Sequence, residues 1–419
     1  MRLKVTDDLR RSRLTVFFRL LLGIPHFIWW TLWTIAALLA AVANWFATLF
    51  AGRPPEPLYR FLSAYVRYST HLYAYMFLAA NPYPAFTGDP GYPVDVELGE
   101  RESQGRWVTG LRLFLLIPAA LIATVFEGSG YAVLFVDEES SAAWSGGTLL
   151  AVAFFGWFVC VVLGRMPQGF RDLQAYGLRY LAQFAAYGLV LTDRYPNVDP
   201  AEPPASGPDH PVRLKVDDDL RRSRLTVFFR LLLALPHFVW LALWWVAAVL
   251  AVIVAWIATL IAGRPPAVLH RFLSAFLRYW THLSAYVALT ANPFPGFTGA
   301  AGSYPVDPEL PPPERQRRLV TLFRLFLAFP ALAVSGALGG LLLVGALLGW
   351  FVSLALGRMP RSLRDAQAYS LRYAAQVSAY LLLVTDRYPY SGPALGAPEP
   401  VPASAPPDEP PPSEAPAVA

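Results

Sequence analysis

The stretch RRSRLTVFFRLLL occupies residues 10–22 and recurs without change at residues 221–233. In both places a proline, a tryptophan and a Gly-Arg pair follow at matching distances, and the two pairs end at Arg53 and Arg264. Similarity at a fixed separation is the signature of repeated structural units. The chain is therefore a tandem duplication.

Each half of the chain is itself double. RWVTGLRLFLLIP (106–118) and RLVTLFRLFLAFP (318–330) repeat the opening pattern, and each is followed by a tryptophan, a Gly-Arg pair and an Arg-Tyr pair. Four repeat units result, separated and followed by segments rich in proline and polar residues. We divide the chain into units at 1–88, 89–196, 213–299 and 300–390, with an insertion at 126–147, a linker at 197–212 and a tail at 391–419 that we predict to be disordered.

The composition indicates a protein surrounded by lipid. Of the 419 residues, 55% are hydrophobic and 15% are charged, whereas a soluble globular protein carries roughly 25% charged residues. Lys4 and Lys215 are the only lysines among the 34 basic residues, so almost all are arginines. The planar guanidinium group pairs bidentately with phosphate, which suits contact with lipid headgroups.

Every unit contains a long apolar run, at 20–52, 113–164, 231–263 and 325–357, and none of these runs contains Lys or Arg. A single helix of the first run would be about 50 Å long, against a hydrocarbon core of about 30 Å. The insertion 126–147 is rich in Gly, Ser and acidic residues, so it must reach water. We therefore predict an all-α integral membrane protein in which each run forms a transmembrane hairpin, with about eight spans in total.

Charge placement predicts the orientation of these hairpins. All 34 basic residues flank the runs. Basic segments remain in the cytoplasm of bacterial membrane proteins. This places both termini and every Gly-Arg turn on the cytoplasmic side of the cell membrane.

A further helix is predicted after each Gly-Arg turn. In the first unit Arg60, Arg67 and His71 fall on one face of it, and an arginine at mid-bilayer would cost roughly 3 kcal/mol. We favour an amphipathic helix in the cytoplasmic interface, with arginines on lipid phosphates; the alternative is a polar stripe that faces the bundle interior. The candidate phosphate-binding residues are Arg53, Arg67, Arg165, Arg179, Arg264, Arg278, Arg358 and Arg372.

Two pairs of histidines occupy matching positions in the two halves: His26 with His237, and His71 with His282. Imidazoles titrate near neutral pH, so these residues are candidates for intramembrane proton transfer or metal binding. Because no carboxylate lies at ligand spacing in the sequence, we favour a structural role and predict no metal and no cofactor. Phosphate-binding loops and catalytic motifs are also missing from the sequence, so we expect neither an enzyme nor a nucleic-acid-binding protein.

Short extended segments are predicted at the start of each half and near the middle. Arg-Leu-Lys-Val occurs at 2–5 and 213–216, and Tyr-Pro-Val at 92–94 and 304–306.

The repeated unit, with its FFRLLL opening, its Trp and Gly-Arg turn, its Arg-Tyr helix and its Thr-Asp-Arg-Tyr-Pro ending, resembles the bacterial domain-of-unknown-function 4389 family. The resemblance covers nearly all of 1–390. Asn81 and Asn292 stand where the pattern has Asp193 and Asp386. The resemblance implies a location in the bacterial membrane, often with tandem copies, and implies no activity.

Two functions remain open from the sequence. One is a transporter or channel-like protein, with two related halves around a path across the bilayer. The other is a membrane-organising scaffold that binds anionic lipid and recruits a protein through its tail. A transporter should take up solute saturably, whereas a scaffold should change the shape of vesicles.

Overall fold

The structure is a computed structural model that describes residues 1–128, 147–200 and 210–393. Most of the insertion 126–147, the linker 197–212 and the tail 391–419 therefore lies outside the described residues. The described part is mostly helical. Each unit contains, in order, a short helix, a long apolar helix and a second helix.

The short helices are α1 (Arg13–Phe17), α4 (Arg106–Gly110), α9 (Arg224–Phe228) and α12 (Arg318–Leu322). The long helices are α2 (Arg19–Ala51), α10 (Arg230–Ala262) and α13 (Arg324–Leu356), and α5 (Arg112–Glu127) with α7 (Thr148–Leu163) takes this place in the second unit. The second helices are α3 (Glu56–Met76), α8 (Gln168–Gly188), α11 (Ala267–Val287) and α14 (Arg361–Leu381).

The predicted transmembrane hairpins are wrong for units one, three and four. In each of them the apolar run is one helix of 33 residues without a reversal. No residue near the middle of these runs has to reach water, so the backbone hydrogen bonds simply continue. The estimate of about eight spans depended on the hairpins and is not confirmed.

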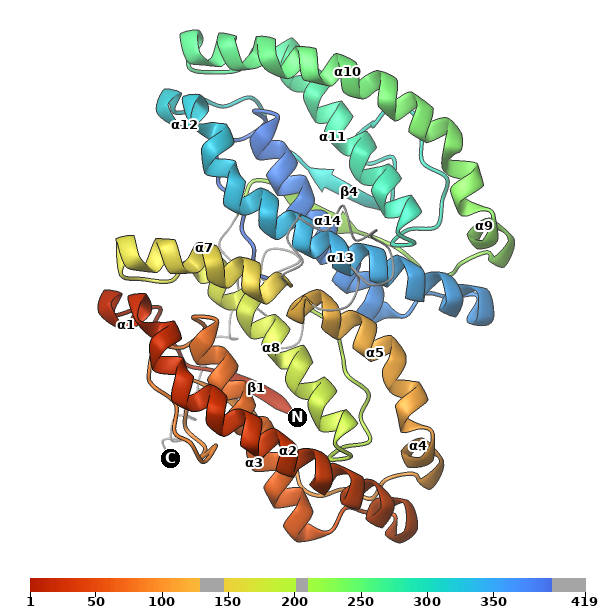
Figure 1. Ribbon diagram of the computed structural model, residues 1–419. Helices are drawn as coiled ribbons and strands as arrows, with labels where there is room; N and C mark the ends of the chain where they lie inside the picture. The colour runs from red at the N-terminus through yellow and green to blue at the C-terminus, as the bar shows by residue number, and fades with distance from the viewer. Residues whose placement is uncertain (129–146, 201–209, 394–419) are drawn as a thin grey trace, which may run out of the picture.

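The insertion in unit two does not mark a reversal either. Thr148 Oγ1 donates a hydrogen bond of 3.0 Å to the Val125 carbonyl, and a Cβ atom on Gly147 would lie 2.3 Å from the Gly128 nitrogen. The residues just before the insertion therefore lie in contact with the residues just after it. Figure 1 shows α5 and α7 running end to end, as two parts of one interrupted long helix.

The long helices form one layer and the second helices form another behind it (Figure 1). Across the layer the order is α2, then α5 with α7, then α13, then α10, so the units follow the order one, two, four, three. Neighbouring long helices run in opposite directions. Packing between α13 and both α5 and α7 joins the two halves of the chain.

The repeated tryptophans connect the units of each half in a reciprocal way. The Trp45 indole donates to the Thr109 carbonyl (2.8 Å), and the Trp157 indole donates to the Val16 carbonyl (3.0 Å). The second half repeats both bonds, from Trp256 to Thr321 at 2.8 Å and from Trp350 to Val227 at 3.2 Å. The two units of a half are therefore related by an approximate twofold arrangement.

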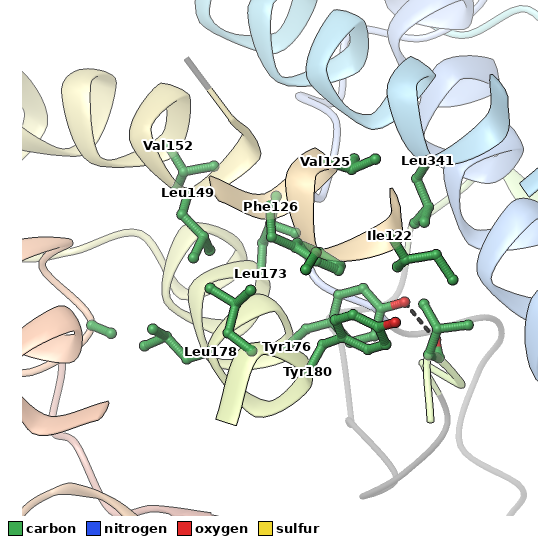
Figure 2. Close-up of a cluster of buried hydrophobic side chains, with 14 of the residues drawn as sticks. Ile122, Val125, Phe126, Leu149, Val152, Leu173, Tyr176, Leu178, Tyr180 and Leu341 are labelled. Carbon is green, nitrogen blue, oxygen red and sulfur yellow. Dashed lines mark hydrogen bonds between the residues drawn. The ribbon is translucent and has the colours of Figure 1, made fainter. Parts of the chain in front are cut away.

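The core lies between the layers and continues across the two halves. Figure 2 shows side chains of α5, α7 and α8 gathered there, with Leu341 of α13 beside Val125 and Ile122. Tyr176 and Tyr369, from α8 and α14, meet edge to face with ring centroids 5.6 Å apart. Apolar and aromatic side chains thus fill the boundary between the halves.

The predicted extended segments at 2–5 and 213–216 are confirmed, whereas those at 92–94 and 304–306 overlap the observed strands only at Val94 and Val306. β1 (Arg2–Val5) pairs antiparallel with β2 (Val94–Glu97), and β3 (Arg213–Val216) pairs in the same way with β4 (Val306–Glu309). These small sheets pack against second helices rather than long ones.

Candidate membrane-binding face

The long helices expose large apolar side chains along their entire length. On α2 the exposed fraction is 74% at Leu20, 71% at Leu39 and 74% at Phe50. Among the described residues, nearly all exposed large apolar side chains belong to the long helices and the short helices before them. We call this surface the apolar face. α2, α10 and α13 are also long and apolar enough to cross a membrane, which indicates membrane association.

The buried side of α2 is unlike the core of a soluble protein. Its buried residues are small or polar and include Gly23, His26, Asn44 and Thr48. Asn44 Nδ2 donates to the Leu189 carbonyl at 2.9 Å, so this amide meets a partner inside the protein. Apolar residues outside and polar residues inside are the arrangement expected when lipid replaces water around a helix.

The arginines predicted to bind phosphate fall into two groups. Those of the Gly-Arg pairs are all exposed: Arg53, Arg165, Arg264 and Arg358. Each follows a glycine that ends a long helix in the left-handed conformation, with φ between 69° and 74°. Because glycine has no Cβ atom, it adopts this conformation without strain. The predicted turn therefore presents its arginine at the end of the apolar face.

Two of these arginines lie opposite another arginine. Arg10 and Arg165 form an isolated antiparallel bridge, and Arg221 and Arg358 form the equivalent bridge in the second half. Among the described residues none of these four side chains has an ion pair. Like charges on directly opposite residues are unfavourable. An anion between them would remove this repulsion.

The arginines of the second helices do not lie at a lipid interface, as we predicted for them. Arg67 is half-buried, with its Nε 3.4 Å from Asp95 Oδ1. Arg179 and Arg372 are buried and donate to the backbone carbonyls of Asp199 and Gly392, respectively. Arg278, at the corresponding position of α11 in the third unit, is half-buried. Because these helices are packed beneath the long ones, these four arginines face the protein interior, as the alternative predicted, while Arg60 near the start of α3 stays exposed.

His26 and His237 are buried core residues. Their Nδ1 atoms lie 2.8 Å from the hydroxyl oxygens of Tyr68 and Tyr279. The His26 ring stacks on Phe86 with ring centroids 4.2 Å apart. Within the described residues no group of three or more His, Cys, Asp or Glu side chains could hold a metal ion. The contacts of these two histidines are those of packing.

His71 and His282 have a carboxylate partner that the spacing in the sequence did not reveal. His71 Nε2 lies 2.9 Å from Asp95 Oδ1, and His282 Nε2 lies 2.6 Å from Asp307 Oδ1. Burial lowers the pKa of His71 despite its carboxylate partner. Burial alone would raise the pKa of Asp95, but hydrogen bonds from the Gly91 amide and His71 hold it below its ordinary value. The neutral imidazole therefore donates to a charged carboxylate, fastening β2 to α3.

The structure also reveals a set of buried arginines that no prediction included. Arg230, the first residue of α10, donates to the carbonyls of Tyr286 (2.5 Å) and Ala291 (2.9 Å) at the end of α11. Its guanidinium carbon also lies 4.4 Å from the Tyr286 ring centroid. The other units make the corresponding contacts through Arg19, Arg112 and Arg324. We call these residues the clamp arginines, because each closes the end of a second helix.

Comparison with known proteins agrees with the repeat pattern. The model of the domain of unknown function DUF4389 matches residues 13–88, 143–198, 224–298 and 318–391. The chain belongs to the DUF4389 family. Its four DUF4389 regions fall on the four repeats, as the resemblance implied. No curated protein and no solved structure matches the chain.

The structure explains where the units depart from the DUF4389 ending. The acidic residue of that ending lies beside a clamp arginine: Arg112 Nη2 is 3.0 Å from Asp193 Oδ1. In the third DUF4389 unit, Arg230 Nη2 instead donates to Asn292 Oδ1 at 3.2 Å. An amide oxygen keeps the hydrogen-bond acceptor while removing the charge. The exchange of Asp for Asn therefore preserves this contact.

Proposed function

We propose that this protein is a monotopic, non-catalytic scaffold that lies in the cytoplasmic leaflet of the cell membrane. Its apolar face enters the lipid, and its second helices and small sheets remain on the aqueous side. The observation that carries this proposal is the continuous exposure of apolar residues along the long helices. A scaffold of this kind organises the lipid surface that it covers.

The length of the apolar face supports helices that lie in the membrane plane. Exposed apolar residues extend from Leu14 to Phe50 in the first unit. A helix of that length measures about 50 Å, whereas the hydrocarbon core is about 30 Å thick. An upright helix would carry some of this surface out of the lipid, while a helix parallel to the membrane keeps all of it in contact.

The charges behind the long helices support the same orientation. Arg60 and Glu56 form an exposed ion pair of 2.6 Å on α3, which packs along α2. Lys4 of β1 and Glu97 of β2 are also exposed and lie on the same side. If α2 stood upright, such residues would enter the bilayer at a cost of roughly 3 kcal/mol each. With α2 in the membrane plane, they remain in water.

A transport path between the halves has less support. That hypothesis needs an opening between α5 with α7 and α13. Phe155 and Phe329 meet there with ring centroids 5.7 Å apart, and Leu341 and Val344 are buried. We therefore favour the scaffold over the transporter.

Labelling both ends of one long helix tests the orientation. In a Cys160→Ala background, we would prepare Arg13→Cys and Arg53→Cys separately and treat intact cells with a membrane-impermeant maleimide. A monotopic protein on the cytoplasmic leaflet predicts protection of both cysteines, with labelling of both after permeabilisation. If α2 crosses the membrane, its ends lie on opposite sides, and one cysteine will be labelled in intact cells.

Arg224→Cys and Arg264→Cys provide the matched test in the second half, at the corresponding ends of α9 and α10. Labelling of both ends in intact cells would place the face on the outer leaflet and contradict the proposed side. Labelling of one end only would exclude the monotopic arrangement.

Removing two arginines from the edge of the apolar face should weaken binding to anionic lipid. Each basic residue near an anionic surface contributes about 1 kcal/mol, so Arg165→Gln with Arg358→Gln should reduce affinity about 30-fold. Flotation with vesicles containing phosphatidylglycerol measures the effect. Arg60→Gln, an exposed site on α3, is the control. An equal loss with neutral phosphatidylcholine vesicles would contradict a role in phosphate binding.

A further inference from the structure

Two cavities lie beside corresponding helix pairs of the two halves, α2 with α3 and α10 with α11. The first has a volume of about 290 Å³ between α2, α3 and α8, and the second has about 270 Å³ between α10, α11 and α13. Their linings use corresponding positions of the repeat, namely Trp30 and Leu241, Tyr73 and Ser284, and Glu127 and Gly339. The third wall differs, because it is the second helix α8 in the first cavity and the long helix α13 in the second.

The cavities arise from how the units pair. The long helices of one half meet through the short helices at their ends, α2 with α4 and α1 with α7. The middle parts of the two long helices make few contacts with each other. α3 and α8 close the space from behind, as α11 and α14 do in the second half.

The second cavity combines exposed and buried lining residues. Phe238 and Leu343 line it and belong to the exposed apolar residues of α10 and α13. Leu283 of α11 and Ala288, the residue that follows α11, also line it, and each is only 3% exposed. The cavity thus leads from the apolar face to the second helices. A molecule that enters it must come from whatever covers that face.

We propose that the second cavity takes one acyl chain of a membrane lipid. This inference rests on the proposed function, which places the apolar face in lipid, where hydrocarbon chains are the surrounding molecules. The lining of the second cavity is almost entirely apolar, and Ser284 is its one hydroxyl-bearing residue. The volumes lie near the lower end of those of small-molecule sites, about 300 Å³. A hydrocarbon chain fits such a site because it leaves no polar group unpaired.

The occupied second cavity would hold a lipid in place beneath the scaffold. A chain drawn between two long helices fills space that would otherwise remain empty in the layer. The first cavity differs from the second because Glu127 contributes a carboxyl group, where the second has Gly339.

Photocrosslinking tests the proposal in the second cavity. The full-length protein would be incorporated into phosphatidylcholine vesicles that contain a phospholipid with a diazirine at the end of one acyl chain. After irradiation, mass spectrometry would locate the adducts. We expect adducts on the buried residues Leu283 and Ala288 in addition to adducts on Leu325, which is 75% exposed on α13. Adducts confined to exposed residues would overturn the proposal.

Filling the cavity provides the second arm of this experiment. Ala346 lines it, and Ala346→Trp should reduce the adducts on Leu283 and Ala288 at least tenfold without affecting Leu325. Ala355→Trp, at an exposed position of the same helix, is the matched control. Ser284→Trp fills the same cavity from α11 and tests the same point if Ala346→Trp does not fold.

Flotation of the same samples separates the two proposals. Protein that floats with the vesicles but has no buried adducts contradicts the cavity assignment alone. Protein that does not float contradicts the proposed membrane-bound state and, with it, the route by which a chain would enter. Buried adducts that persist unchanged in both filling variants would also overturn the assignment.

Discussion

Lysine at Leu39 and Leu250 should release the protein from neutral lipid vesicles. These residues occupy equivalent exposed positions on α2 and α10, with 71% and 62% of their surface exposed. A lysine in the hydrocarbon region costs about 3 kcal/mol, so Leu39→Lys with Leu250→Lys should weaken partitioning about 10⁴-fold. Flotation with phosphatidylcholine vesicles at decreasing lipid concentration measures this loss.

The control for the lysine pair carries the same added charge outside the apolar face. Ser103→Lys with Ala301→Lys changes exposed residues in the segments that precede α4 and β4. This control should float as the unchanged protein does. Equal flotation of the two double variants would show that the apolar face is not the surface in contact with lipid.

Loss of one clamp arginine should have the largest effect on stability. In Arg230→Met, the buried carbonyls of Tyr286 and Ala291 lose their side-chain donor, and unsatisfied buried acceptors cost about 1–3 kcal/mol each. We expect a loss of about 3 kcal/mol and, for a chain of 419 residues, a fall of about 3–4 °C in the unfolding midpoint. Circular dichroism of the protein in detergent, recorded as the temperature rises, measures the unfolding midpoint.

The exposed neighbour Arg221 supplies the comparison. Arg221→Met removes the same charge at a position whose side chain makes no ion pair in the described part of the chain. Its unfolding midpoint should change little. A similar fall in both variants would mean that net charge, rather than the contacts at the end of α11, explains the loss.

The contrast between Arg230 and Arg221 also shows what a motif can and cannot predict. Both belong to the repeated stretch RRSRLTVFFRLLL, and their chemistry is identical. Only the packing of α10 against the end of α11 buries one and leaves the other exposed. The same limitation led to the wrong environment for Arg179 and Arg372, which sequence reasoning placed on lipid phosphates. Carboxylate partners for His71 and His282 were missed because Asp95 and Asp307 lie on strands beyond the second helices.

The sequence by itself determined the four repeats, the family, the lipid-compatible composition, the turn at each Gly-Arg pair and the two strands β1 and β3. These features depend on residue order and local backbone preferences, which are present before the chain folds. The tertiary structure decided that each long run is one helix, that the second helices lie beneath it, and which arginines remain exposed. The physical reason is that the large apolar residues of these runs lie on the exposed side, so an apolar stripe does not mark the buried face as it does in a soluble protein. That choice comes only from the partners that pack against it.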